Sequence, residues 1–287
     1  MFNKRIWKLV ILVPVLLALT TWLLTQNADA QQDERVATFV THITPDLESQ
    51  TQPAPQVHLE IGESARVGDW VTARLVATEG QNLAGFQVDL RFDGDKLGLG
   101  TAQPVMGNAA AAQLLSLGYV RQEQGLLLGV ALCPAVDCAS AHYQQDRQSA
   151  QGMAGTVELA SFTFQVRQGG VIHLEVADII LVDPQGQLLL SSQDYPLATV
   201  PQPPLTALDL SANNQINDAD AYLVVSAWRE LQRTGRCLAP AVTAYDVDGN
   251  GCLNVADVQT ILSVWGEQPM PPYATGRRPG YECHLHR

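Results

Sequence analysis

Hydrophobic and polar residues alternate along much of the chain after residue 56. In residues 84–92, AGFQVDLRF, the apolar side chains of four residues point one way and Gln, Asp and Arg point the other. The same alternation runs through residues 156–166, TVELASFTFQV, with one slip between Leu159 and Phe162 that a β-bulge would absorb. A period of two residues is typical of half-buried β-strands. These segments therefore predict strands.

Further strands are predicted where short apolar runs end in Gly- and Asp-rich turns. They fall at residues 57–61, 70–77, 126–132, 171–181 and 186–192. Many short strands separated by such turns favour an antiparallel β-sandwich. Two segments break the pattern. Residues 108–118, NAAAAQLLSLG, predict a short helix or loop over one edge, and residues 133–154 predict an exposed excursion because they are polar and rich in small side chains.

The first 30 residues have a different character. Lys4, Arg5 and Lys8 precede an apolar run, and an Ala-x-Ala sequence closes the segment at residues 28–30. This order predicts a signal peptide over residues 1–30. The alternative is an uncleaved membrane anchor, because the apolar run is nearly long enough to cross a bilayer. In either case the remaining chain is expected to be secreted or at the cell surface, and residues 31–55 are expected to form a linker.

A sequence repeat with an offset of 37 residues follows a Pro-rich spacer at residues 196–204. The matched pairs are Asp209 and Asp246, Asn213 and Asn250, Asn217 and Asn254, Asp220 and Asp257, and Trp228 and Trp265. Each copy is a loop rich in Asp and Asn followed by a segment with helical periodicity. The apolar stripes are Ala221, Val224, Val225 and Trp228 in the first copy, and Val258, Ile261, Leu262 and Trp265 in the second. These two stripes are expected to pack on each other.

Each loop has the ligand spacing of an EF-hand calcium loop, with side-chain oxygens at positions 1, 3, 5, 9 and 12 and a carbonyl at position 7. In the second loop the predicted ligands are Asp246, Asp248, Asn250, the carbonyl of Cys252, Asn254 and Asp257. In the first loop they are Asp209, Ser211, Asn213, the carbonyl of Gln215, Asn217 and Asp220. Two Ca²⁺ sites are therefore predicted, with binding coupled to folding. The second loop has three carboxylates against two, so it is expected to bind more tightly.

Charge and cysteine content fit an exported, cation-binding chain. Residues 31–287 contain 14 Lys and Arg residues and 28 Asp and Glu residues. This negative net charge repels nucleic acid and suits divalent cations. Five cysteines in an exported chain predict disulfides. Cys133 with Cys138 would close a small loop, and Cys237 is expected to pair with Cys252, which leaves Cys283 unpaired.

The duplicated loop, each copy with only a following helix, resembles the dockerin module of cellulosomes. DLSANNQINDAD and DVDGNGCLNVAD carry this resemblance, which covers residues 205–267 and leaves a tail at 268–287. It implies a small α-helical, calcium-dependent domain that docks onto a cohesin. The resemblance implies that loop positions 10 and 11 take part in recognition of the partner. These positions are Asp218 and Ala219 in the first loop, and Val255 and Ala256 in the second.

Residues 56–195 resemble a cohesin. The resemblance rests on GDWVTARLVATEGQNLAGFQVDLRFDGDKL, GTVELASFTFQV and IILVDPQGQLL in that order. It implies that this part of the chain is a mainly β, jelly-roll sandwich. The overall fold class expected is therefore mainly β: an antiparallel jelly-roll β-sandwich plus the small dockerin-like calcium-binding domain.

The chain offers no convincing catalytic grouping, so an enzyme is not expected. Asp93 and Asp95 are predicted to cap a turn, and His58 and His173 to be surface or satisfied residues of strands. The tail sequence CHLHR, with Cys283, His284 and His286, could ligate a transition metal, but a mobile terminus is favoured.

The leading hypothesis is an extracellular, non-catalytic adaptor or scaffold that binds cohesin- or dockerin-bearing proteins in a polysaccharide-degrading assembly. A second hypothesis is direct carbohydrate binding by the sandwich. Its aromatic candidates are Trp70, Tyr119 and Tyr143, with Trp70 expected in a strand core. A third hypothesis is that the two modules pack together within one chain, giving a calcium-stabilised surface protein without an assembly role.

Overall fold

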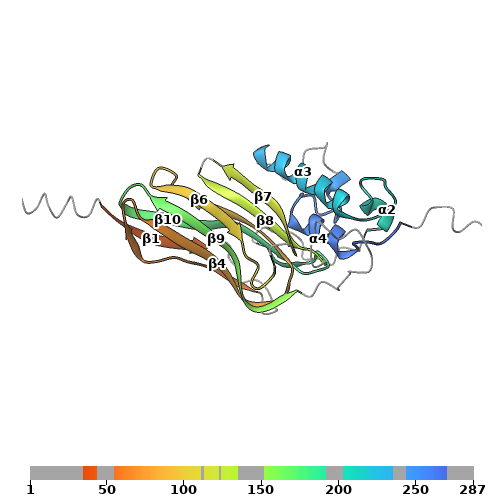
Figure 1. Ribbon diagram of the computed structural model, residues 1–287, viewed down its shortest axis with the longest axis horizontal. Helices are drawn as coiled ribbons and strands as arrows, with labels where there is room; N and C mark the ends of the chain where they lie inside the picture. The colour runs from red at the N-terminus through yellow and green to blue at the C-terminus, as the bar shows by residue number, and fades with distance from the viewer. Residues whose placement is uncertain are drawn as a thin grey trace, which may run out of the picture.

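The chain folds into a two-layered β-sandwich with helices packed at one end (Figure 1). The computed structural model describes residues 35–43, 55–110, 113–122, 124–134, 152–191, 203–234 and 244–269. The strands are β1 (Val36–Ile43), β2 (Gln56–Glu60), β3 (Ser64–Arg66), β4 (Trp70–Leu83), β5 (Gly85–Phe92), β6 (Leu97–Pro104), β7 (Leu114–Gln122), β8 (Gly125–Leu132), β9 (Met153–Val166), β10 (Gly170–Val182) and β11 (Leu188–Ser191). The helices are α2 (Leu205–Leu208), α3 (Asp218–Thr234) and α4 (Val255–Ser263).

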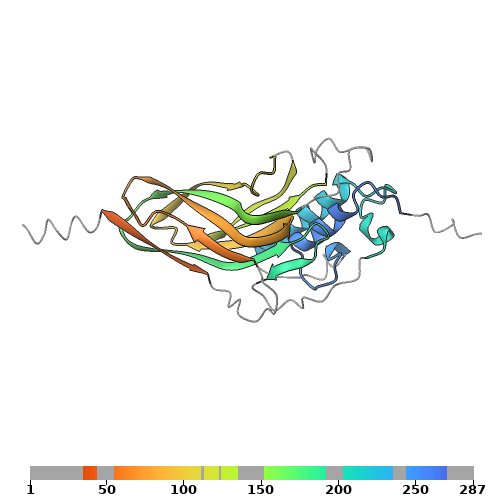
Figure 2. The same ribbon diagram turned by 90° about the horizontal axis from the view of Figure 1, so that it is seen from below.

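The strands form two sheets, which Figure 2 shows as two layers. Sheet A has seven strands in the order β3-β1-β10-β5-β8-β7, with β11 paired to β10, and sheet B has the order β2-β4-β9-β6. Every pairing is antiparallel except that of β1 with β10, which is parallel. The predicted sandwich is confirmed, with this one parallel pair as a correction to the antiparallel expectation.

The main core lies between the two sheets. It takes the inward residues of the alternating strands, including Phe86, Val88 and Leu90 of β5, all of which are fully buried. The predicted bulge is also present, because the pairing of β4 with β9 shifts by one residue between Leu75 and Val76 and steps over Leu159. This extra residue lets Leu159 and Phe162 both face the core despite the slip in alternation.

Two sequence predictions about the sandwich are wrong. Residues 31–55 are not simply a linker, because β1 lies within them and buries Ala37 and Phe39 in the main core. The segment 108–118 is predicted as a short helix or loop, but residues 114–118 belong to the strand β7, which begins at Leu114 and pairs with β8. Pairing along β8 supplies tertiary contacts that outweigh the local helix preference of the Ala- and Leu-rich segment.

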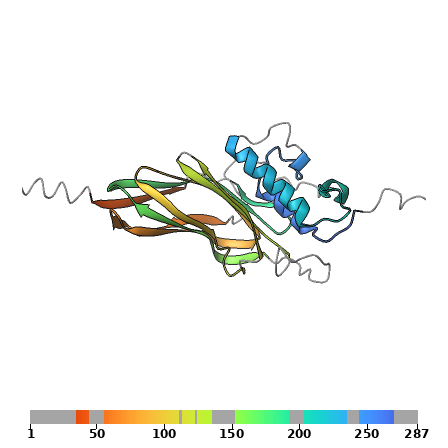
Figure 3. The ribbon, with the colours of Figure 1, turned by 45° about the horizontal axis from the view of Figure 1, so that its top comes forward.

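A second apolar cluster joins the helices to the outer face of sheet A. Figure 3 shows α3 and α4 lying at one end of the sandwich, beside β7 and β8. The sheet contributes Leu115, Leu117, Leu127, Ala131, Ile180 and Val182 to this cluster. The helical part contributes Leu208, Ile216, Ala221, Val224, Val225, Trp228, Leu231, Leu253, Val255, Ala256, Val258, Ile261, Leu262, Val264 and Trp265. The helices therefore share their core with the sheet, and α3 and α4 also contact each other as predicted.

The strand β8 is the centre of this arrangement. All eight of its residues are buried, because Leu126 and Leu128 face the main core while Leu127 and Ala131 face the helices. A strand covered on both faces has a continuous apolar sequence rather than an alternating one, and GLLLGVAL is such a sequence.

Candidate metal centre

The second loop brings three carboxylates together. Ligating oxygens of Asp246, Asp248 and Asp257 all lie within 4.8 Å of one another, and no other group of three or more such side chains occurs in the part of the chain that the structure describes. Asp257 is fully buried, and the other two carboxylates are half-buried. Three carboxylates at this spacing form an oxygen ligand set that suits a hard cation.

The start of α4 holds Asp257 in place. Asn254 caps the helix: its side chain accepts a hydrogen bond from Ala256 N, and the Asp257 side chain accepts one from Asn254 N in return. The other oxygen of Asp257 accepts from Val247 N at 2.8 Å. Gly251, at loop position 6, has φ +88°, a left-handed value that glycine adopts without strain.

Burial disfavours the ionised forms of Asp248 and Asp257. It raises the pKa of Asp248 to about 7, and the neighbouring Asp246 carboxylate pushes that pKa the same way. Burial also raises the pKa of Asp257 well above its usual range, as does the charge of Asp248. In addition, Asp246 Oδ1 is buried with no hydrogen-bond partner. An unpaired buried oxygen beside two destabilised carboxylates fits a site that takes a cation.

The first loop shares several of the internal hydrogen bonds of the second. Asp220 occupies the place of Asp257: its Oδ1 accepts from Ser211 N and its Oδ2 from Asn217 N, both at 2.8 Å. Asp209 accepts from Asn213 N and Asn214 N. Asn214, at loop position 6, has φ +61°, so this asparagine adopts the left-handed conformation that Gly251 adopts in the second loop. The buried Ser211 Oγ has no partner, which again leaves an oxygen available to a cation.

The remaining predicted ligands lie in tight turns within the two loops. Asn213 Oδ1 accepts from Gln215 N, and Asn250 Oδ1 accepts from Cys252 N in the equivalent place. The Cys252 carbonyl accepts from Asn254 Nδ2. The structure thus gives both copies one backbone plan, while only the second places three carboxylates within ligating distance of one another. Occupation of either site by Ca²⁺ stays a prediction.

The docked helices contact sheet A through specific polar groups as well as apolar ones. Trp228 Nε1 donates to Gln87 Oε1 at 2.9 Å, and both side chains are buried. Gln259 Nε2 donates to the carbonyl oxygens of Leu132 and Pro184, each at 3.3 Å. The sequence analysis did not identify Gln87 or Gln259 as contact residues, and nothing in their local pattern singles them out.

The positions that the dockerin resemblance implies for recognition differ between the two copies. Val255 and Ala256, from the second loop, are fully buried. A Cβ added at Gly85 of β5 would lie 3.2 Å from Val255 Cγ2, and one added at Gly186 would lie 2.8 Å from the Ala256 carbonyl oxygen. Val255 and Ala256 therefore face the sandwich of their own chain. Asp218 and Ala219, from the first loop, are half-buried.

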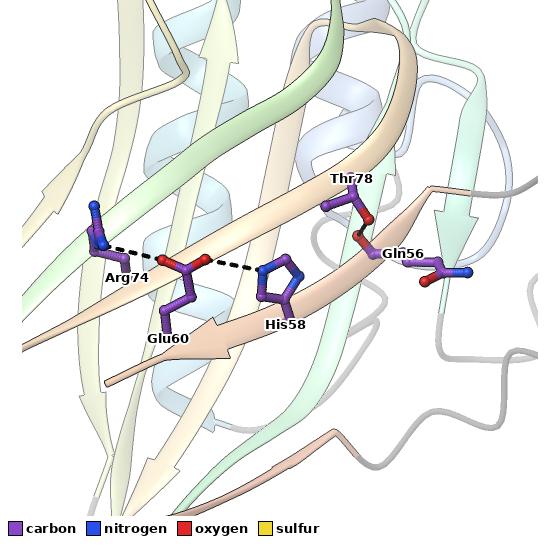
Figure 4. Close-up of polar contacts among 5 residues, drawn as sticks. All are labelled: Gln56, His58, Glu60, Arg74 and Thr78. Carbon is purple, nitrogen blue, oxygen red and sulfur yellow. Dashed lines mark hydrogen bonds and ion pairs between the residues drawn. The ribbon is translucent and has the colours of Figure 1, made fainter. Parts of the chain in front are cut away.

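The other candidate residues have structural roles or exposed positions. Asp93 Oδ1 accepts from Asp95 N and Lys96 N, so the predicted turn cap is confirmed. His58 lies on the surface of sheet B, where it contacts one oxygen of Glu60 while Arg74 contacts the other (Figure 4). Trp70 was expected in a strand core, but it is 62% exposed because Val71, the next residue, faces the core instead.

Several sequence predictions lie outside the described residues. These are the segment 1–30, most of the excursion predicted at residues 133–154, which includes Tyr143, and the tail residues Cys283, His284 and His286. Cys133 and Cys252 lie within the described residues, but their predicted partners Cys138 and Cys237 do not, so both pairings stay predictions. None of the helices described is long and apolar enough to cross a membrane.

Comparisons with known proteins give only distant likenesses. No protein-family model matches the chain, and no curated protein matches it. Among solved structures, a type II cohesin domain from the cellulosome of Acetivibrio cellulolyticus matches with 19% identity over 46% of this chain and 76% of that chain, at a TM-score of 0.32. A non-cellulosomal cohesin from Archaeoglobus fulgidus matches with 11% identity over 52% and 78%, at a TM-score of 0.27. A cohesin module from a family 33 glycoside hydrolase of Clostridium perfringens matches with 8% identity over 45% and 84%, at a TM-score of 0.33. At TM-scores of this size the likeness does not assign the chain to a family.

Proposed function

We propose that the chain is an extracellular, non-catalytic adaptor whose calcium-loop helices bind a cohesin-like sandwich. One observation carries the proposal: α3 and α4 bury their apolar stripes on the outer face of sheet A, with Val255 and Ala256 in the contact. In this chain the sandwich belongs to the same molecule, so the described state is a closed form. Partners that bear a cohesin or a dockerin would compete for one of the two faces.

Calcium is the cation proposed for both loops. Asp246, Asp248 and Asp257 would hold it in the second loop, and Asp209 and Asp220 with Ser211 in the first. A bound Ca²⁺ would supply the positive charge, and the oxygen atoms of the loops would coordinate it. The chain's own residues fix the loops. Asp220 accepts a hydrogen bond from Ser211 N in the first loop, and Asp257 accepts one from Val247 N in the second. Each bond joins its loop to the start of the following helix. Loop geometry therefore sets the direction in which α3 and α4 extend from the two loops.

Tethering favours the closed form. Two faces joined by a short linker meet at an effective concentration of roughly millimolar. A free partner at lower concentration must therefore bind more tightly to displace the tethered face. An adaptor of this kind would join partners only after its helices leave sheet A. Participation in polysaccharide degradation follows from the sequence resemblance and forms part of the same proposal.

A second candidate function is a calcium-stabilised surface protein without an assembly role. One observation favours it: a single apolar cluster spans the helices and sheet A, so both faces are already used within the chain. The two functions differ in whether the helices of one molecule bind the sandwich of another.

A complementation experiment with two full-length variants tests the adaptor function. Ala131→Asp places a charge on the buried outer face of sheet A, and Thr260→Arg places one on the buried side of α4 that faces Gly186. Each variant alone keeps one intact face and is expected to be monomeric. Mixed in calcium, they should form a one-to-one dimer in sedimentation velocity, and chelator should dissolve it.

The matched control is Val171→Asp. Val171 lies on β10 and is 50% exposed, so this variant should behave as the unchanged protein does, alone or in mixtures. Circular dichroism checks that each variant retains its strands. A mixture that stays monomeric in calcium, with both variants folded, would exclude the adaptor function and favour the surface protein.

A further inference from the structure

Two histidines lie side by side on the outer face of sheet A, outside the helix contact. In the parallel pairing of β1 with β10, Val40 stands opposite His173 and His42 stands opposite Glu175. The neighbours Phe39, Ile172 and Leu174 face the main core, so His42, His173 and Glu175 project from the other face. Both histidines are exposed.

The separation of the two rings suits a shared metal ion better than a hydrogen bond. His173 Nδ1 and His42 Nε2 are 3.4 Å apart, and the rings are stacked with centroids 5.5 Å apart. The N–H···O hydrogen bonds of proteins are shorter than this separation, at about 2.7–3.2 Å between the heavy atoms. Two imidazole nitrogens on one tetrahedral ion, each about 2.05 Å from it, are separated by about 3.4 Å.

Glu175 offers a third ligand. It is the register neighbour of His42 and lies two residues from His173 on the same strand face. Its carboxylate is not within 4.8 Å of both imidazoles, because the Asp246 set is the single group of three ligating side chains in the described ranges. A change of the Glu175 rotamer would be needed to bring its carboxylate to an ion shared by the two imidazoles. His173 and Glu175 also line a groove of about 840 Å³, through which water can complete the coordination.

We propose that His42 and His173, joined by Glu175, form a surface site for a divalent transition ion such as Zn²⁺ or Cu²⁺. Imidazole nitrogens suit these ions, whereas the oxygen-only calcium loops suit harder cations, so the two kinds of site select different metals. Because its ligands come from β1 and β10, the bound ion would link these strands. The site is independent of the proposed adaptor function.

Calorimetric titration of the full chain with ZnCl₂ tests the site, in excess calcium to fill the loops. The background carries Cys283→Ser, His284→Gln and His286→Gln, so that the tail cannot bind the ion. His42→Gln and His173→Gln should each weaken the binding of one equivalent by about tenfold or more. The same chain with Cu²⁺ should give an electron paramagnetic resonance spectrum with two coordinated nitrogens.

His58→Gln is the matched control. His58 is another strand histidine beside a glutamate, Glu60, but it lies on sheet B. In Figure 4 its ring contacts the Glu60 carboxylate. This variant should bind Zn²⁺ as tightly as the background protein. The proposal is overturned if the background protein does not bind Zn²⁺, if both His42→Gln and His173→Gln bind normally, or if His58→Gln weakens binding equally.

Discussion

Metal-free protein is expected to be less stable at about pH 7.5 than at about pH 5. The pKa of Asp248 in the folded protein is about 7, above its value of 3.8 in the unfolded chain. The folded state therefore binds more protons, and its stability falls as pH rises from about 4 through 7. Between about pH 5 and about pH 7.5, Asp248 alone is expected to lower the free energy of unfolding by about 2–3 kcal/mol, at ~1.4 kcal/mol per pH unit, and Asp257 acts in the same direction.

Chemical unfolding in chelator, followed by far-ultraviolet circular dichroism at both pH values, measures this effect. Saturating calcium should remove the pH dependence, because the cation stabilises the ionised carboxylates. Asp248→Asn is the informative variant, since an amide resembles a neutral carboxyl group in shape. It should make the metal-free protein more stable at about pH 7.5 and bind calcium more weakly. Equal or greater stability of the metal-free protein at the higher pH would contradict the described loop.

Replacing Trp228 by alanine is expected to cost about 3–5 kcal/mol of unfolding free energy. Trp228 is fully buried between α3 and sheet A, and the change removes its ring together with the bond to Gln87 Oε1. Leaving Gln87 buried without its partner adds to the cost. Chemical denaturation in calcium measures the loss.

Two comparisons separate the contributions of Trp228. Trp70→Ala, at a position that is 62% exposed, should change stability by no more than about 0.5 kcal/mol. Trp228→Phe keeps an aromatic ring but leaves Gln87 unpaired, and adding Gln87→Leu should recover part of its loss. A loss in Trp228→Ala no larger than that in Trp70→Ala would show that the helices do not depend on this contact.

Strand positions were predictable because most strands have one face in the core and one in water. Phe86, Val88 and Leu90 of β5 show this alternation and lie in the core, although Gln87 and Asp89 on the other face of this strand are buried as well. The prediction failed where pairing rather than pattern decides the structure. The strand β7 forms from an Ala- and Leu-rich segment because β8 pairs with it, and β1 is too isolated in the sequence to reveal its partner β10.

The two loops were predictable in more detail than the place where their helices bind. Ligand spacing and the 37-residue offset fix loop geometry locally, as the equivalent bonds of Asp220 and Asp257 illustrate. Docking depends on surfaces far apart in the sequence, so the helix stripes alone predicted only that the two helices pack on each other. A signal was present in β8, whose sequence GLLLGVAL is apolar on both faces and so requires a second cover.

Hydrogen exchange of the full chain, with and without calcium, tests the central claim most directly. That claim is that calcium loops hold α3 and α4 against sheet A. With calcium, backbone amides of α4, Val255–Ser263, should exchange slowly, as those of a packed helix do. In chelator at about pH 7.5 they should exchange much faster, while those of β4 and β9 in sheet B stay protected. Exchange of α4 that is rapid in calcium, or equally slow in both conditions, would contradict the account.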